Sequence, residues 1–133
     1  MKIYNLFISH SWNYDHQYSN LTNLLQRKPF FTFKNYSVPS ANPIIGARTD
    51  KQLEAAIENK VRSSSVVVIM TGVYATYSKW INKEIEIANN RFAVPKPIIG
   101  VKPWGQTNIS KVVQDNAVEI VGWNTESIVS AIR

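Results

Sequence analysis

The chain has no cysteine and only two histidines among its 133 residues. The lack of cysteine excludes disulfides, thiol nucleophiles and zinc–thiolate sites, and it fits the reducing interior of a cell. No stretch approaches the roughly 20 apolar residues that a membrane span needs. The six largely apolar residues that follow Met1 and Lys2 are too few for a signal peptide. We therefore expect a cytoplasmic protein that does not enter a membrane.

Acidic residues are also scarce, because nine Asp and Glu face 15 Lys and Arg, which leaves a net charge of +6. Hydrophobic residues make up 44% of the chain, enough for a single domain over residues 1–133 with a sizeable core. A basic surface favours anionic partners, either a nucleic acid or a small molecule such as a dinucleotide. The densest basic and aromatic cluster, residues 27–34, is also typical of a helix that stops at Pro29 and continues as a strand. We predict no nucleic-acid partner.

Strand-like and helix-like segments alternate along the chain. Strands are expected at residues 3–8, 31–36, 65–70, 97–101 and 117–121. Helices are expected at residues 15–27, from a capping box at Thr49 onward, around Glu84 and at residues 125–132. This alternation predicts parallel βαβ units with right-handed crossovers. The predicted fold is a flavodoxin-like three-layer α/β sandwich, a five-stranded parallel sheet in the order 2-1-3-4-5 with helices on both faces.

Ligands of such a sheet bind outside the carboxyl ends of the strands, where the strand order reverses between the first and third strands. The first strand ends in Phe7, Ile8, Ser9, His10, Ser11 and Trp12. The third strand is the dense apolar run Val66–Met70, and a polar loop connects it to a helix with Trp80 and Glu84. Two polar and aromatic segments that are remote in sequence are therefore predicted to meet at one crevice.

Helix periodicity separates the two acidic residues of this helix. One narrow stripe forms the predicted core face: Ile81, Ile85, Ala88 and Phe92. Glu84 lies at the margin of that stripe, in line with Trp80, where partial desolvation raises the pKa of a carboxyl group. Glu86 falls on the far side with Lys83 and Asn90, as a solvated charge. An aromatic side chain beside a carboxylate suits a cationic or sugar-bearing ligand, but an ordinary glutamate at a helix margin shows the same pattern.

Two segments resemble sequence boxes of Toll/interleukin-1 receptor (TIR) domains. Residues 4–11 are similar to the first box, in which a strand delivers an aromatic residue and a serine. Residues 66–84 resemble the strand-plus-helix signature, in which a Trp precedes the catalytic Glu by four residues. The loop at residues 38–46 contains prolines and stands where TIR domains have the loop that gates the site and mediates contacts. The likeness covers nearly the whole chain and points to bacterial TIR-like proteins of Thoeris-type antiphage defence.

This resemblance implies an enzyme that cleaves the bond between nicotinamide and ribose in NAD, with NAD as the substrate and neither a metal nor another cofactor. Nicotinamide leaves as a neutral molecule, so one carboxylate that orients the ribose and stabilises its oxocarbenium-like charge is sufficient. The resemblance assigns the catalytic role to Glu84. It places the following residues around the dinucleotide: Phe7, Ser9, His10, Ser11, Tyr77 and Trp80.

The resemblance also implies self-association through TIR–TIR contacts and a separate effector that responds to a nucleotide signal, either ADP-ribose or a cyclic form of it. Two alternatives stay open. One is a non-catalytic TIR interaction module, and the other is a relative of the nucleoside deoxyribosyltransferases, which share the sheet and use a glutamate on nucleosides. A phosphorelay receiver domain is disfavoured, because Asp15 stands alone after the first strand where that class needs paired acids.

Overall fold

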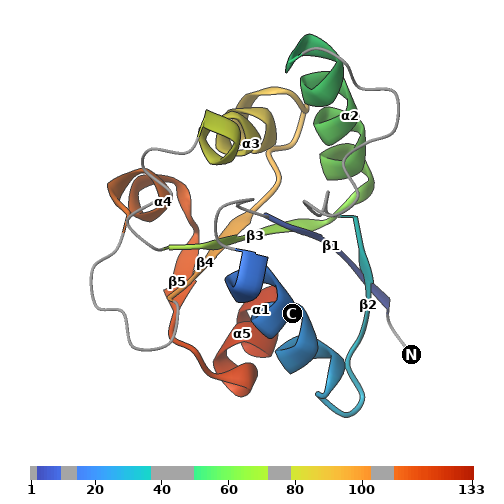
Figure 1. Ribbon diagram of the computed structural model, residues 1–133, viewed down its shortest axis with the longest axis vertical. Helices are drawn as coiled ribbons and strands as arrows, with labels where there is room; N and C mark the ends of the chain where they lie inside the picture. The colour runs from blue at the N-terminus through green and yellow to red at the C-terminus, as the bar shows by residue number, and fades with distance from the viewer. Residues whose placement is uncertain (1–2, 10–14, 37–49, 72–78, 103–109) are drawn as a thin grey trace.

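The computed structural model describes residues 3–9, 15–36, 50–71, 79–102 and 110–133, which contain five strands and five helices (Figure 1). The strands are β1 (Ile3–Ile8), β2 (Thr32–Asn35), β3 (Val66–Met70), β4 (Ile98–Val101) and β5 (Glu119–Val121). The helices are α1 (Asp15–Gln26), α2 (Asp50–Ser63), α3 (Lys79–Asn90), α4 (Lys111–Asn116) and α5 (Thr125–Ile132). The predicted alternation is confirmed, and α4 adds a short helix between β4 and β5 that the sequence patterning did not predict.

The five strands form one parallel sheet in the order β2-β1-β3-β4-β5, which confirms the predicted topology. β3 lies at the centre of the sheet, and all five of its residues are buried. A central strand of a parallel sheet is covered on both faces, which explains its unbroken apolar sequence. The reversal of strand order falls between β1 and β3, as predicted.

Helices cover both faces of the sheet (Figure 1). Each face has its own apolar core. α1 and α5 pack on one face, against Leu6 and Ile8 of β1. α2, α3 and α4 pack on the other face, against Phe7 of β1 and Val67 and Ile69 of β3. Successive side chains of a strand point to opposite faces. The residues that directly follow β1 and β3 in the same alternation therefore face α2, α3 and α4.

The basic and aromatic cluster at residues 27–34 is a helix end that turns into a strand, as expected. α1 ends at Gln26 and β2 begins at Thr32. The ring of Phe31 is buried and stacks on Tyr4 with 5.3 Å between the ring centroids. Phe30 is exposed and adopts a left-handed backbone conformation with φ of 61° in the connecting turn. In the described part of the chain, no helix has the length and apolar character needed to cross a membrane.

The buried side of α3 is wider than the predicted stripe. Ile81, Ile85 and Ala88 are buried as expected, whereas Phe92 beyond the helix end is only half-buried. Ile87 is also fully buried. It lies in line with Glu84 on the flank that helix periodicity treated as the margin. The expectation that Glu84 is only partly desolvated is therefore wrong, because neighbouring elements cover this flank of the helix as well as the stripe that faces the sheet.

Candidate active site

Ser9 and Thr71 stand at the carboxyl ends of the two strands between which the strand order reverses. Ser9 directly follows β1, and its N–H donates to the carbonyl of Val68 in β3 at 2.8 Å. Thr71 directly follows β3, and its N–H donates to the carbonyl of Val101 in β4 at 2.9 Å. Both residues are buried. By strand alternation, both side chains lie on the face that α2, α3 and α4 cover.

Glu84 comes to the same edge from α3, with only 4% of its surface exposed. Its burial raises the pKa of the carboxyl group from 4.5 to about 8, because a charge in the protein interior loses its hydration. The Ser9 hydroxyl opposes this increase in pKa as a hydrogen-bonding neighbour of the carboxyl group. In the described part of the chain, however, no group meets the distance and angle of a hydrogen bond to Ser9 Oγ. The effect of Ser9 on the pKa of Glu84 places the two side chains next to each other, so the end of β1 and α3 meet at this edge.

Buried polar atoms without a hydrogen-bond partner gather at this edge of the sheet. They are Ser9 Oγ, Thr71 Oγ1 and Glu84 Oε2. Elsewhere in the described residues the same condition holds for Glu86 Oε2, which still lies 3.2 Å from the guanidinium group of Arg91. Native proteins pair nearly all of their buried polar atoms, because each unpaired one costs about 1–3 kcal/mol. A group of such atoms at the switch point of the sheet is what a site for a polar ligand requires.

The structure describes only some of the predicted site residues, and those residues lie in different environments. Phe7 is fully buried in the core between the sheet and α2, α3 and α4, two residues before Ser9 on the same face. Trp80 lies in α3 one turn before Glu84, as predicted. The side chain of Trp80 and three further predicted residues lie outside the described part of the chain: His10, Ser11 and Tyr77.

Thr71 was not among the residues predicted for the site. The available signal was its position, since it is the first polar residue after β3, as Ser9 is the first after β1. It differs from an ordinary threonine at a strand end because it is completely buried and because its hydroxyl group has no hydrogen-bond partner among the described residues. In the described residues, no group of three His, Cys, Asp or Glu side chains could hold a metal ion.

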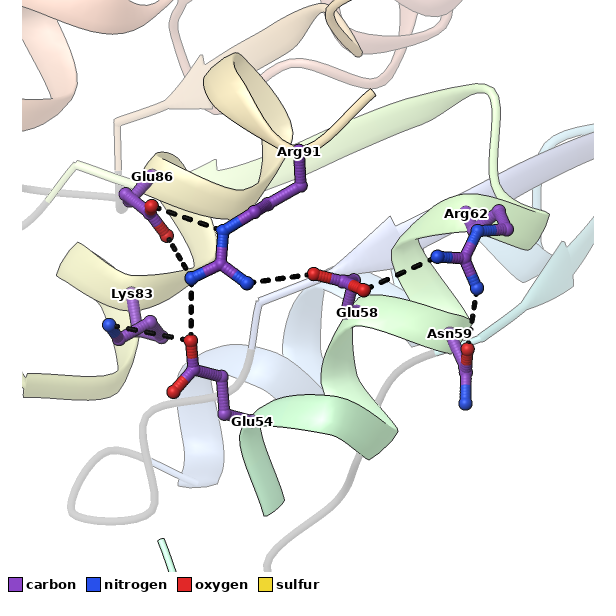
Figure 2. Close-up of polar contacts among 7 residues, drawn as sticks. All are labelled: Glu54, Glu58, Asn59, Arg62, Lys83, Glu86 and Arg91. Atoms are coloured by element: carbon purple, nitrogen blue, oxygen red, sulfur yellow. Dashed lines mark hydrogen bonds and ion pairs between the residues drawn. The ribbon is translucent and has the colours of Figure 1, made fainter. Parts of the chain in front are cut away.

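An ion-pair cluster holds α3 against α2 on the side of α3 away from the sheet (Figure 2). Arg91, directly after α3, lies 2.7 Å from a carboxylate oxygen of Glu54 and 2.8 Å from one of Glu58, both in α2. It also pairs with Glu86 in α3. Lys83 of α3 lies 3.6 Å from the same oxygen of Glu54. These contacts limit how α3, and Glu84 with it, rotates or shifts relative to α2.

The cluster corrects the prediction for Glu86. The sequence pattern placed it on the far side of the helix as a solvated charge, together with Lys83. Both residues do point away from the core, but Glu86 is partly buried and paired with Arg91. The cluster also affects Glu54, where the hydrogen bond from Arg91 lowers the pKa of the carboxyl group. The two acids of α3 thus differ in environment: Glu84 is buried, and Glu86 forms an ion pair on the outer side of the helix.

The family model of the TIR-like domain of the Thoeris protein ThsB matches residues 7–108, more than half of the chain. The matched range contains the ends of β1 and β3, all of α3 and the Arg91 cluster. No match was found among curated proteins.

Proposed function

Because the chain belongs to the family of TIR-like domains of the Thoeris protein ThsB, we propose that it cleaves NAD between nicotinamide and ribose, with Glu84 as the catalytic residue. Membership of this family points to a role in antiphage defence. The observation that carries the proposed chemistry is the buried carboxyl group of Glu84, which lies beside Ser9 at the switch point of the sheet. One of its oxygens has no hydrogen-bond partner among the described residues.

The raised pKa of Glu84 suits a cationic ligand. With a pKa of about 8, the carboxyl group of the free protein is largely protonated at neutral pH. The nicotinamide ring of NAD carries a positive charge, and a positive charge nearby favours the carboxylate form. Binding of NAD is therefore expected to displace the proton from Glu84. The binding site then has a negative charge beside the bond that breaks.

The carboxylate acts on the charge that develops during cleavage. As the bond between C1′ of the ribose and the ring nitrogen breaks, the electron pair stays with nicotinamide, which leaves as a neutral molecule. The positive charge passes to the ribose in an oxocarbenium-like state. A carboxylate in a buried site stabilises this charge more strongly than it would in water. Attack of water on C1′ then gives ADP-ribose and a proton, whereas attack by an atom of the ligand gives a cyclic product.

The substitution Glu84→Gln tests this role, because it preserves the size of the side chain and removes its charge. We expect it to abolish NAD cleavage. Glu86→Gln is the matched control, the same substitution on the outer side of the same helix. It removes one partner of Arg91 from a partly exposed ion pair, which should change the stability little, and it should retain cleavage. Turnover by Glu84→Gln at the rate of the parent would contradict the assignment.

The substrate and the role need separate measurements. A panel of NAD and deoxynucleosides distinguishes NAD cleavage from deoxyribosyl transfer, and a folded protein that turns over neither is an interaction module. We further propose that the product is a diffusible signal for a separate effector. Small molecules filtered away from an active reaction should then activate a candidate effector. A response that requires the protein itself, and never follows from the filtrate, would contradict the signalling role.

A further inference from the structure

The mechanism proposed above makes no use of Thr71, although this residue has the most enclosed unpaired hydroxyl group in the site. Its exposed fraction is 0%, and Oγ1 has no hydrogen-bond partner among the residues that the structure describes. A threonine hydroxyl donates one hydrogen bond and accepts two. Enclosing it without any partner destabilises the fold, so this arrangement needs an explanation that packing alone does not supply.

Neighbouring segments fix the backbone of Thr71 on both sides. Its N–H donates to the carbonyl of Val101 in β4 at 2.9 Å, and its carbonyl accepts from the N–H of Ser110, just before α4, at 2.8 Å. The residue therefore cannot turn away from the site while these two bonds hold. Its hydroxyl group remains at the edge of the sheet in the free protein.

The lack of a side chain at Gly100 leaves room for the methyl group of Thr71. A Cβ atom added at Gly100 would lie only 2.8 Å from Cγ2 of Thr71. The methyl group of Thr71 thus occupies the space above β4 that a side chain at position 100 would fill. With the methyl group directed toward β4, the hydroxyl group points in a different direction, away from Gly100.

Sheet register brings Thr71 within reach of the other two polar side chains. Ile8 pairs with Val68, so Ser9 lies beside Ile69, and Thr71 follows two residues later on the same face. Adjacent strands are about 4.8 Å apart and rise about 3.3 Å per residue. The Cα atoms of Ser9 and Thr71 are therefore roughly 8 Å apart. Since Ser9 adjoins Glu84, the three side chains lie within the span of one nucleotide.

We propose that Thr71 is a substrate-binding residue, whose hydroxyl group hydrogen-bonds an oxygen atom of the nucleotide and whose methyl group occupies the space that Gly100 leaves open. The nucleotide as ligand rests on the function proposed above. The claim that the hydroxyl group lacks a partner rests on the geometry of the free protein alone. The unpaired hydroxyl group and the identity of the ligand can therefore be tested separately.

The substitution Thr71→Val tests the hydroxyl group, because valine keeps the methyl group above Gly100 and replaces only the oxygen. The free variant should be at least as stable to urea as the parent, since the lost hydroxyl had no partner. Its KM for NAD should rise about three- to tenfold, the effect of one lost hydrogen bond, with little change in kcat. Thr71→Ser, which retains the hydroxyl group, should have a KM close to that of the parent.

Thr22 in α1 is the matched control for this substitution. It is also a buried threonine, but its hydroxyl donates to the carbonyl of Ser19 at 3.0 Å. Thr22→Val should therefore lower the stability to urea and leave the KM for NAD unchanged. If Thr71→Val instead behaved like Thr22→Val, less stable and with an unchanged KM, Thr71 would be a structural residue and the proposal would be wrong.

A binding measurement separates this proposal from the catalytic one. ADP-ribose binds without being cleaved at the nicotinamide bond, so calorimetric titration of the parent, Thr71→Val and Thr71→Ser does not depend on turnover. If the parent fails to cleave NAD, the proposed function is contradicted, and the titration still decides the role of Thr71. Weaker binding by Thr71→Val than by the other two proteins supports the proposal. Equal binding by all three, or no binding by the parent, overturns it.

Discussion

Replacing Glu84 by glutamine is expected to stabilise the folded protein, increasingly so as the pH rises. In the unfolded chain this carboxyl group loses its proton near the ordinary pKa of 4.5, whereas in the folded protein it does so near 8. Between these pH values the folded state holds more protons than the unfolded state, so raising the pH favours unfolding. The contribution of Glu84 to stability is therefore fully present below the pKa that it has in the unfolded chain. It is lost as the pH rises through the pKa that it has in the folded protein. Glutamine cannot ionise, so the variant does not lose stability in this way as the pH rises.

The size of the effect follows from the difference between the two pKa values. Each pKa unit corresponds to about 1.4 kcal/mol, so the whole difference amounts to about 5 kcal/mol. By proton linkage, about 3 kcal/mol of this loss of folding stability has already occurred at pH 7. The stability of Glu84→Gln relative to the parent should therefore grow by about 4 kcal/mol between about pH 5 and about pH 9. This is a large share of the 5–15 kcal/mol that typically holds a domain together.

Urea unfolding followed by tryptophan fluorescence, repeated across this pH range, measures the effect directly. All other titrating groups are common to the parent and the variant, so they cancel in the difference between the two. Glu86→Gln, on the outer side of the same helix, controls for the substitution itself. A difference between Glu84→Gln and the parent that stays constant with pH would show that the carboxyl group is not enclosed as the structure has it, and the reasoning would fail.

Three further predictions follow from the site and its support. The kcat/KM for NAD should rise with pH and level off above about 8, since this parameter reports the pKa of the free enzyme; a flat profile through that range would contradict a role for the Glu84 carboxylate. Arg91→Ala should lower the urea midpoint modestly and reduce the dependence of stability on salt, whereas an unchanged urea midpoint at low salt would show that the cluster does not hold α3. The rate of NAD cleavage should rise more steeply than protein concentration if TIR–TIR contacts complete the site; proportional rates from a protein that remains monomeric would exclude this. The loop at residues 37–48, which we expect to make such contacts, lies outside the described residues.

Much of the architecture could be predicted from the sequence because it depends on local patterns. The apolar run of β3 and the alternation of strands with amphipathic helices predicted the strand order, and the order located the switch point between β1 and β3. Helix periodicity placed Glu84 nearer the core face than Glu86, and the resemblance to TIR domains implied its catalytic role. The missed element was α4, a helix of six residues, which is too short to establish a helical period of apolar residues.

The environment of each site residue could not be predicted in the same way. Helix periodicity gives the angle of Glu84 around the axis of α3, but the width of the buried flank depends on which elements pack there. The burial of Ile87 shows that this flank is covered as well. The pairing of Glu86 depends on Glu54 and Glu58 of another helix, through Arg91.

The sequence by itself determined the fold and placed Glu84 nearer the core face of its helix than Glu86, because both follow from periodicities along a single chain. The tertiary structure decided that Glu84 is buried beside Ser9 and that Thr71 has an unpaired hydroxyl group at the same edge. The physical reason is that desolvation and hydrogen-bond satisfaction depend on every group that surrounds an atom. Those groups come from segments that are far apart in the chain and become neighbours only when the sheet and its helices assemble.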